Sequence, residues 1–324
     1  MGQRYSFGFS DSFIAEIGKI TLKQLHFDAV AIKKAYDKLK DFAEELGIKL
    51  PTPRLAGFCY THIASLGANI EFPESSEPKP FPLISSPDEI DKLKEPADYL
   101  SSPIIQKKLN TLKELKKLCP ETPDFIGHLL EGPITTAVLI LSQEFLTLPY
   151  DNPQKAHEFL EFSTESALNY AKAITEYFGR ELKSNGFPDD FAGMFPPDIF
   201  KEFVVPYWKR LYEGLKSEIR TLHSELLRVE HLPFLKELNV EYFDPGVDQY
   251  LKPEDLYAHC PCKCQLRITS WQIDNLSADS LVNLYIKLAQ YHPYVISFSI
   301  HRLKNLDKIK KLLEIARKME KEDG

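Results

Sequence analysis

The chain has 324 residues, of which 43% are hydrophobic and 27% charged, and 40 Lys and Arg stand against 47 Asp and Glu for a net charge of −7. These values exclude a disordered or collagen-like chain. They also argue against binding to nucleic acid or to anionic lipid, because both partners favour a strongly basic protein. No apolar run is long enough to cross a bilayer, so we expect no contact with a membrane.

The N-terminal residues and the cysteines bear on secretion and on redox state. The first residues, MGQRYSFGFSDSF, lack a basic segment followed by an apolar core and therefore predict no signal peptide. The five cysteines are an odd number, which argues against a framework of disulfides. The sequence therefore predicts a reduced, cytoplasmic protein.

The first fifty residues are predicted to be helical. Apolar side chains recur at helical spacing over residues 20–46, and two prolines directly beyond residue 50 end the pattern. A short apolar run at 55–60 predicts a buried strand. Residues 72–100 are rich in Pro, Ser and Glu and predict an excursion over the surface.

Strands and helices alternate along the rest of the chain. The pattern predicts further strands at 125–130, 219–223, 240–243, 264–271 and 294–300. It predicts helices at 105–118, 133–181, 197–218, 232–238, 278–290 and 306–318. Such alternation is typical of βαβ units and a parallel sheet. We therefore predict an α/β fold, a (β/α)8 TIM-type barrel over 51–324 with an N-terminal helical extension over 1–50. An open doubly wound sheet is the alternative.

Four stretches of sequence are informative when they are taken together and in order. They are LGANIEFPE from residue 66, IGHLLEGP from residue 126, DDFAGMFPPDIFKEFVVPYWKRL from residue 189, and TLHSE from residue 221 followed by LKELNVEYFDP from residue 235. This set resembles the uroporphyrinogen decarboxylase superfamily over residues 50–318. The resemblance implies a (β/α)8 barrel and one of two chemistries. One is the cofactor-free decarboxylation of uroporphyrinogen, and the other is zinc-dependent methyl transfer between a corrinoid and a thiol or pterin.

For the methyltransferases, the resemblance implies a zinc ion held by a His-x-Cys pair after a late strand and by a residue at the end of the last strand. His223 matches the family histidine, and Glu225 stands where these enzymes have Cys. Alternate residues of a strand share a face, and zinc accepts carboxylate oxygen, so this pair could hold the ion. His301 lies near the third position. We expect zinc at His223, Glu225 and His301; a polar pair at the barrel rim and a surface histidine are the alternative.

A second set of candidate ligands is the run HCPCKC from residue 259. Cys260, Cys262 and Cys264 could bind a soft metal or act in redox chemistry. In an extended chain the three thiols share one face, which suits burial in the core equally well. Lys263 is expected to lower the pKa of a neighbouring thiol.

Two carboxylates are the candidate catalytic groups. The resemblance implies that Asp190 faces the barrel mouth, although the adjacent acids at 189–190 could instead cap the following turn. Glu131 lies at a predicted strand end and is a candidate ligand or base. Tyr60 and His62 follow the first predicted strand, where the family's early substrate contacts lie, and with Asp190 they are candidate substrate contacts; a role as loop or helix-start residues is the alternative. His128 is predicted to be a packed core histidine.

The favoured function is a zinc-dependent methyltransferase. It would move a methyl group between a corrinoid, as methylcobalamin or on a corrinoid protein docked at the barrel mouth, and a small donor or acceptor. Decarboxylation of uroporphyrinogen is the second interpretation, because Arg54 is the lone arginine near the first predicted strand and a negatively charged chain repels a polyanionic substrate. A repurposed, non-catalytic barrel that binds a ligand or partner is the third.

Overall fold

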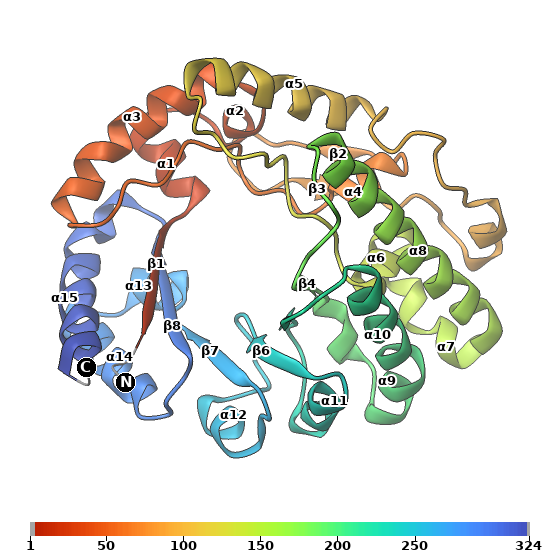
Figure 1. Ribbon diagram of the computed structural model, residues 1–324. Coiled ribbons are helices and arrows are strands. Elements are labelled where there is room, and N and C mark those ends of the chain that lie inside the picture. Colours follow the sequence, from red (N-terminus) through yellow and green to blue (C-terminus); the bar gives the residue numbers. More distant parts are fainter. Residues whose placement is uncertain (1–3, 323–324) are drawn as a thin grey trace.

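The protein is built on a curled parallel sheet. The computed structural model describes residues 4–322, and within them six strands pair in the order β1-β8-β7-β6-β5-β4, every pair parallel. Figure 1 shows the strands curving around a common centre with helices on the outside. The predicted α/β class is confirmed. Within the described residues the sheet has six strands rather than eight.

The strands are short. They are β1 (Tyr5–Phe9), β4 (Gly186–Pro188), β5 (Arg220–His223), β6 (Val240–Asp244), β7 (Lys263–Arg267) and β8 (Val295–Ile300). A separate antiparallel pair joins β2 (Ile70–Glu71) and β3 (Lys79–Pro80). In β8 the sequence VISFSI alternates, and Ile296, Phe298 and Ile300 are buried. A β-branched and aromatic alternation of this kind buries one face of a strand under the helices.

Helices cover the outer face of the sheet. The α-helices are α1 (Asp11–Gly18), α2 (Leu22–Phe27), α3 (Ala29–Glu45), α4 (Thr61–Ser65), α5 (Pro103–Leu118), α6 (Pro133–Leu141), α7 (Leu148–Asp151), α8 (Pro153–Tyr177), α9 (Pro197–Phe203), α10 (Val205–Gly214), α11 (Leu232–Glu237), α12 (Pro253–His259), α13 (Ser270–Asn275), α14 (Ala278–Ala289) and α15 (Leu306–Glu322). The 3-10 helices are η1 (Pro87–Lys92), η2 (Ser142–Leu146), η3 (Asp190–Met194), η4 (Val229–His231) and η5 (Leu303–Asn305). Across residues 4–322, no helix combines the length and apolarity needed to span a membrane.

Two long predicted helices are divided by capping residues. The predicted helix at 20–46 breaks at Asp28, whose carboxylate accepts from the Ala31 N–H at 2.9 Å and begins α3. The predicted helix at 133–181 breaks at Ser142, which has φ 68°, and α8 begins again after Asn152, whose side chain accepts from Lys155 N–H. Asp and Asn favour such caps because their side-chain oxygens replace the missing backbone acceptors of the first turn.

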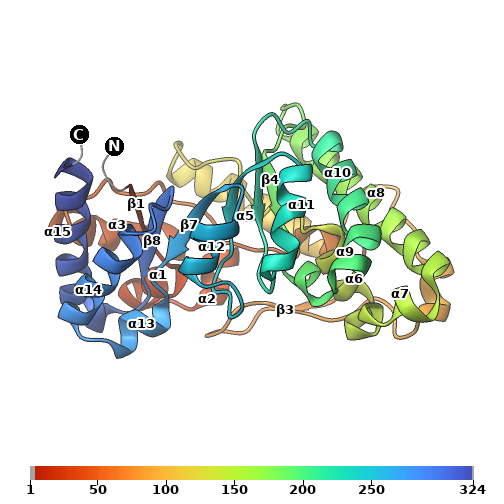
Figure 2. The same cartoon turned by 90° about the horizontal axis from the view of Figure 1, so that it is seen from below.

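The sheet begins inside the segment predicted to be a helical extension. Residues Tyr5–Phe9 form β1, with Phe7 opposite Phe298 of β8, so the helical prediction is wrong at this point. Alternating aromatic residues in YSFGF favour a strand, but a run of five residues interrupted by Gly8 gives only a weak pattern. Figure 2 shows β1, β8 and α15 lying together at one end of the molecule.

The predicted strands at 55–60 and 125–130 do not form. Both segments lie between β1 and β4 and join their neighbours through isolated hydrogen bonds, such as His128 N–H to the Phe58 carbonyl at 2.9 Å. Gly127 has φ 158°, and a Cβ there would lie 2.5 Å from the Phe58 oxygen. The Gly57 N–H bonds to the Asp11 carboxylate rather than to a strand. Glycines and a side-chain acceptor thus interrupt the ladder that the apolar residues would favour.

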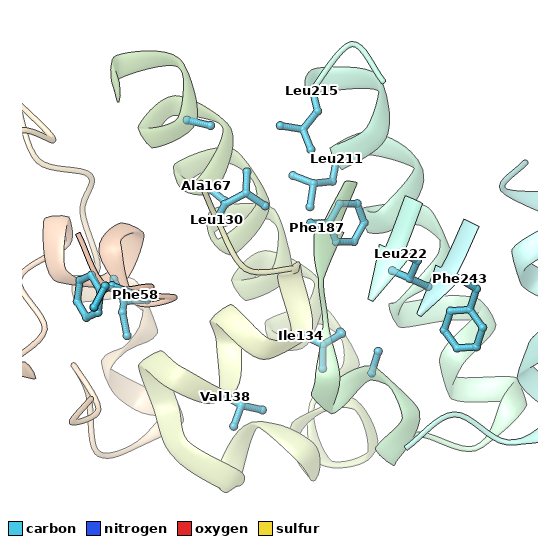
Figure 3. Packing of buried hydrophobic residues seen from close by; sticks show 14 of the residues in the cluster. Phe58, Leu130, Ile134, Val138, Ala167, Phe187, Leu211, Leu215, Leu222 and Phe243 are labelled. Atoms are coloured by element: carbon cyan, nitrogen blue, oxygen red, sulfur yellow. The ribbon is translucent and has the colours of Figure 1, made fainter. Parts of the chain in front are cut away.

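The core between the sheet and the outer helices fixes the strand ends in place. Figure 3 shows Phe187, Leu222 and Phe243 on the neighbouring strands β4, β5 and β6, with Leu211 of α10 and Leu215, the residue after α10, on the same side as Phe187. All five side chains are buried. Because the outer face of these strands is anchored, the residues at their carboxyl ends are held in a defined arrangement.

Candidate functional site at the carboxyl ends of the strands

The carboxyl ends of β4 to β7 bring four charged residues together, which we name the acid–histidine cluster: Asp190, His223, Asp244 and Arg267. His223 ends β5 and lies opposite Asp244 at the end of β6, while Arg267 ends β7. Asp190 begins η3 directly after β4. Parallel strands place their carboxyl ends at one edge of the sheet, so the cluster follows from the topology.

Two carboxylates flank the imidazole of His223. Its Nδ1 lies 3.1 Å from Asp244 Oδ2, and its Nε2 lies 3.4 Å from Asp190 Oδ1. Arg267 hydrogen-bonds to the same Asp244 through two nitrogens: its Nε donates to Oδ1 at 3.1 Å, and its Nη2 donates to Oδ2. Asp244 therefore joins the arginine to the histidine and orients both.

The residues of the cluster shift one another's pKa values. Burial alone would raise the pKa of Asp244, but the hydrogen bonds from His223 and Arg267 lower it to about 2. Burial would lower the pKa of His223, whereas the hydrogen bond to Asp244 and the charge of Asp190 raise it. Burial raises the pKa of Asp190 against the attraction of His223. At neutral pH, Asp244 is thus ionised.

The adjacent acids Asp189 and Asp190 have separate positions. Asp189 is fully buried, and its carboxylate accepts from the Thr135 N–H at 2.7 Å and the Trp208 indole N–H at 2.6 Å. Asp190 accepts from the Glu225 N–H at 3.3 Å and reaches the cluster. Asp189 therefore caps α6, and Asp190 is the acid at the site.

Glu225 lies beside the cluster and faces the loop after β6. Its Oε1 accepts from the Val247 N–H at 3.0 Å. Gly246 in the same loop has φ 64°, and a Cβ there would lie 2.4 Å from Glu225 Oε1 and 2.9 Å from His223 Cε1. Glycine is therefore required where the loop passes the Glu225 carboxylate and the His223 ring.

Glu131 faces the cluster from the other side of β4. It is buried, and burial raises its pKa well above the usual range, with the negative charges of Asp190 and Asp189 adding to the effect. The Cys59 thiol hydrogen-bonds to this carboxyl group. Burial also raises the pKa of the neighbouring Tyr60 to about 12. Burial and the neighbouring acids thus favour the protonated form of Glu131.

The remaining predicted histidines lie in different surroundings. His62 is 1% exposed in α4, with Nε2 3.1 Å from Ser166 Oγ in α8, so the structure places it in the core and not at the strand ends. His128 is exposed, and the prediction of a core position for it is wrong. His301 follows β8 and bonds through Nε2 to Ser299 Oγ at 2.9 Å, and among the described residues no hydrogen bond or ion pair joins it to the acid–histidine cluster.

The three thiols near β7 lie close together. Cys262 and Cys264 hydrogen-bond to the sulfur of Cys260, and these bonds lower its pKa to about 4 against the opposing effect of burial. Lys263 was expected to assist, but its ammonium group points to the other face of the strand, over the ring of Tyr242. The neighbouring thiols, and not the lysine, therefore stabilise the Cys260 thiolate.

The described side chains do not form a ready-made metal centre. Among residues 4–322, no group of three or more His, Cys, Asp or Glu side chains stands in an arrangement that could hold a metal ion. A cavity of about 300 Å3 lies on the Arg267 side of the cluster, and Arg267 is the one cluster residue in its wall; Gly246, Asp248, Leu266, Thr269 and residues of α12 and α14 complete it. The site thus combines a charged cluster with space for a small molecule.

Sequence reasoning assigned no role to Asp244 and Arg267. Each is the last residue of its strand, which in a parallel sheet is the position nearest the site, so the strand boundaries were the available signal. Asp11, after β1, was missed in the same way; its carboxylate lies 3.5 Å from Arg54 Nη2 and accepts from the Gly57 N–H at 2.8 Å.

Known proteins resemble this chain in sequence and in fold. The methylated-thiol--coenzyme M methyltransferase of Methanosarcina mazei is 24% identical over 227 residues, which cover 67% of this chain and 57% of that protein. A uroporphyrinogen decarboxylase of Prochlorococcus marinus is 24% identical over 169 residues, 49% of this chain and 46% of that protein. The chain thus spans about half the length of the curated relatives it matches.

Among solved structures, a methyltransferase from Methanosarcina mazei shares the fold, with a TM-score of 0.71 at 15% identity over 98% of this chain and 94% of that one. Residues 57–260, well over half of the chain, match the family model described as uroporphyrinogen decarboxylase (URO-D). The match includes the end of β5 with His223 and the end of β6 with Asp244. This chain is therefore a member of the uroporphyrinogen decarboxylase family.

Proposed function

We propose that this protein is a methyltransferase acting on a small substrate at the acid–histidine cluster. The observation that carries the proposal is His223, which stands at the position of the family histidine with one carboxylate at each ring nitrogen. The relative from Methanosarcina mazei, named for methylated thiols and coenzyme M, supports a thiol or its methyl thioether as the substrate class. The cavity of about 300 Å3 beside Arg267 offers room for such a compound.

For the fold, we propose a TIM-type barrel in which irregular segments occupy two of the strand positions. Segments 55–60 and 125–130 lie between β1 and β4, where the second and third strands of such a barrel would stand. Their buried apolar side chains, including Leu55, Phe58 and Ile126, support this correspondence.

Zinc is the cofactor that we propose, with His223 and Asp190 as two facing ligands and Glu225 as a third that would turn from the Val247 N–H toward the ion, because the described side chains are not already arranged around one. The 3.4 Å between His223 Nε2 and Asp190 Oδ1 exceeds the usual hydrogen-bond range of about 2.7–3.2 Å. It matches the edge of about 3.3–3.6 Å between two ligands of a tetrahedral ion with bonds of about 2.0–2.2 Å. Asp244 on the other nitrogen is the outer carboxylate that metal-bound histidines commonly have. Glu225, whose carboxylate bonds to Val247 N–H, would be the third ligand, and bound zinc would keep a thiol substrate deprotonated.

The carboxyl groups have a separate task in this proposal. Glu131 is protonated and buried beside Asp190, so it can supply a proton to a leaving thiolate or take one from an arriving thiol. Asp244 faces His223 Nδ1 and thereby leaves Nε2 of the neutral imidazole for the metal, and Arg267 keeps Asp244 ionised. Tyr60 lies beside Glu131 and is the aromatic contact that we propose for the substrate.

The methyl carrier that we propose is a corrinoid presented by a partner protein. Large apolar side chains are exposed in the connections that follow the carboxyl ends of β4, β6, β7 and β8, the same end as the cluster. They are Met194, Val247, Tyr250, Trp271 and Leu303, each at least 40% exposed. Such a rim of exposed apolar side chains is typical of an interaction surface.

Metal content tests the zinc site. Full-length protein purified without an affinity tag is analysed by ICP mass spectrometry, together with His223→Ala, Asp190→Asn and Glu225→Gln. We expect near-stoichiometric zinc that each of the three substitutions removes. His301→Ala and the surface variant His157→Ala are controls that keep it. Zinc that survives these changes but disappears when Cys260, Cys262 and Cys264 are replaced would contradict the assignment, as would protein that takes up no zinc.

Turnover tests the reaction itself. The wild-type protein is mixed with methylcobalamin and coenzyme M or a simple alkyl thiol, and the loss of the methyl–cobalt absorbance is followed. We expect turnover that His223→Ala abolishes. Decarboxylation of uroporphyrinogen in a parallel assay would replace the proposal by the second family chemistry. Binding of either compound without turnover would identify a non-catalytic barrel.

A further inference from the structure

A second cavity lies away from the acid–histidine cluster and is lined by all three clustered thiols. It has a volume of about 330 Å3 between α12 and the turn that precedes β8. Besides Cys260, Cys262 and Cys264, its wall contains the side chains of Tyr257, Tyr291, His292 and Tyr294. Each of the three cysteines is partly exposed. The thiols are therefore accessible to a small molecule of mainly apolar character.

None of the four residues of the acid–histidine cluster lines this cavity, which shares Pro253, Leu256 and Leu266 with the cavity beside Arg267. Along β7, Cys264 and Leu266 alternate with Lys263 and Arg267, so the two pairs point to opposite faces. Arg267 contacts Asp244 on one face, and Cys264 faces the cavity on the other. Three residues of a strand also separate Cys264 from Arg267 by about 10 Å. The thiols thus belong to a different site.

Cys260 is the centre of the thiol group. It follows α12 in an extended conformation, with φ −75° and ψ 125°, and its N–H bonds to the Leu256 carbonyl at 3.0 Å. The neighbouring thiols of Cys262 and Cys264 favour negative charge on its sulfur and lower its pKa. The Cys264 sulfur lies 3.5 Å from the Cys262 carbonyl oxygen, which keeps these two residues against each other. One sulfur therefore has two neighbouring thiols within reach.

We propose that Cys260, Cys262 and Cys264 form a thiol–disulfide exchange site that takes small organic disulfides. The Cys260 thiolate attacks one sulfur of the disulfide RSSR, its S–S bond breaks, and RS− leaves and takes up a proton from water. The thiol of Cys262 or Cys264 then attacks the Cys260 sulfur, a bond forms between the two protein sulfurs, and the second RSH leaves with the proton of the attacking thiol. The protein loses two electrons, and the small disulfide gains them.

The arrangement meets the requirements for such exchange. The attacking group must be a thiolate, and hydrogen-bond donors stabilise negative charge on sulfur. A resolving thiol must stand beside it, and the short run of residues 260–264 supplies two. The aromatic wall formed by Tyr257, Tyr291 and Tyr294 can hold the organic part of a disulfide against the thiols.

The experiment uses full-length protein and 2-hydroxyethyl disulfide as the probe. Reduced protein is incubated with the probe, quenched in acid, alkylated and analysed by intact-mass and peptide mass spectrometry. We expect the loss of the mass of two hydrogens and protection of two of the five cysteines from alkylation. Peptide mapping is expected to join Cys260 to Cys262 or to Cys264.

Variants separate the roles of the thiols. Cys260→Ser should abolish the cluster disulfide, whereas Cys119→Ser, which changes a buried cysteine elsewhere, should leave it intact. With Cys262 and Cys264 both replaced by Ser, the mixed disulfide on Cys260 should accumulate because no resolving thiol remains. A disulfide that joins Cys262 to Cys264, or none at all, would overturn the proposal. One metal ion per purified chain that is lost on Cys260→Ser would overturn it as well. The readout is independent of methyl transfer.

Discussion

Asp189 and Asp190 are consecutive residues whose carboxylates point to opposite sides of the chain. The carboxylate of Asp189 is enclosed by the first turn of α6 and the indole of Trp208, whereas that of Asp190 faces the imidazole of His223 at 3.4 Å. Their separation follows from the backbone: Asp189 is the last extended residue, and Asp190 begins η3. One acid therefore supports the fold while its neighbour serves the site.

The first prediction concerns Asp189. The groups around the Asp189 carboxylate are all N–H donors. In Asp189→Asn the side-chain NH2 would face donors instead of acceptors, so we expect the free energy of unfolding to fall by about 3 kcal/mol. Urea unfolding followed by circular dichroism measures the change. Asp198→Asn, at an exposed position in α9, is the matched control and should change stability by less than about 0.5 kcal/mol. Equal effects in both variants would contradict the capping role.

The second prediction separates backbone strain from the shape of the site. Gly246 and Gly179 have nearly equal φ values, 64° and 67°, but a Cβ at Gly179 meets nothing within 4 Å. Alanine at either position should cost about 1 kcal/mol of stability, because both glycines are left-handed. Only Gly246→Ala displaces Glu225 and His223, so we expect zinc and methyl transfer to be lost in that variant alone. Retention of both in Gly246→Ala would refute the proposed role of the loop.

The third prediction concerns the partner of His223. Asp244→Asn removes the charge that raises the pKa of His223, so that pKa should fall, as NMR of the histidine ring carbons would show. We also expect methyl transfer or zinc affinity to fall by about 10- to 100-fold. Glu241→Gln, an exposed neighbour in β6, is the control. An unchanged histidine titration would show that the 3.1 Å contact does not govern the imidazole.

The fourth prediction concerns a buried pair of bases remote from the site. Lys108 is fully buried, and its Nζ lies 3.1 Å from His26 Nδ1; burial, with the charge of Arg54 acting in the same direction, lowers the pKa of Lys108 to about 7. A lysine whose folded pKa lies below its unfolded value binds fewer protons when folded. The free energy of unfolding should therefore rise between pH 7 and pH 10, by up to roughly 4 kcal/mol, because over this range the unfolded chain loses the extra proton that it binds on Lys108.

Lys108→Met tests whether Lys108 causes this rise in stability with pH. The variant should show a flat stability between pH 7 and pH 10, because the group that titrates is gone. At pH 7 it should be at least as stable as the wild type, since an apolar side chain replaces a partly charged one among Phe27 and Phe58. Urea titrations across this pH range provide the measurement. A rise in stability of equal size in the variant would assign the effect to other groups.

The sequence was sufficient for the regular part of the fold. Apolar alternation located β5, β6, β7 and β8, and helical spacing located α5, α14 and α15, because these elements bury one face against the core. The pattern could not show that residues 55–60 and 125–130 stop short of pairing. That outcome depends on Gly127 and on the Asp11 side chain, which act across long stretches of chain.

The site was predictable only where a motif marked it. His223, Glu225 and Asp190 stood in stretches with a family pattern, and the structure brings them to one strand edge. The links of Asp244 to His223 and to Arg267 arise from the register of neighbouring strands, which no local spacing encodes. His62 was a candidate because it follows a predicted strand, where the family's early substrate contacts lie, but the fold buries its ring against α8.

The pairing of β1 with β8 has a consequence for biosynthesis. Tyr5 lies opposite Ile296, so β1 leaves the ribosome long before β8, its one sheet neighbour among residues 4–322, exists. At about 5–20 residues per second, the delay is roughly 15–60 s, and during it the aromatic strand YSFGF offers an open edge to other chains. Contacts of such high sequence separation also slow folding. Nascent-chain aggregation should therefore originate at β1, and chaperones that shield exposed aromatic segments should raise the yield of folded protein.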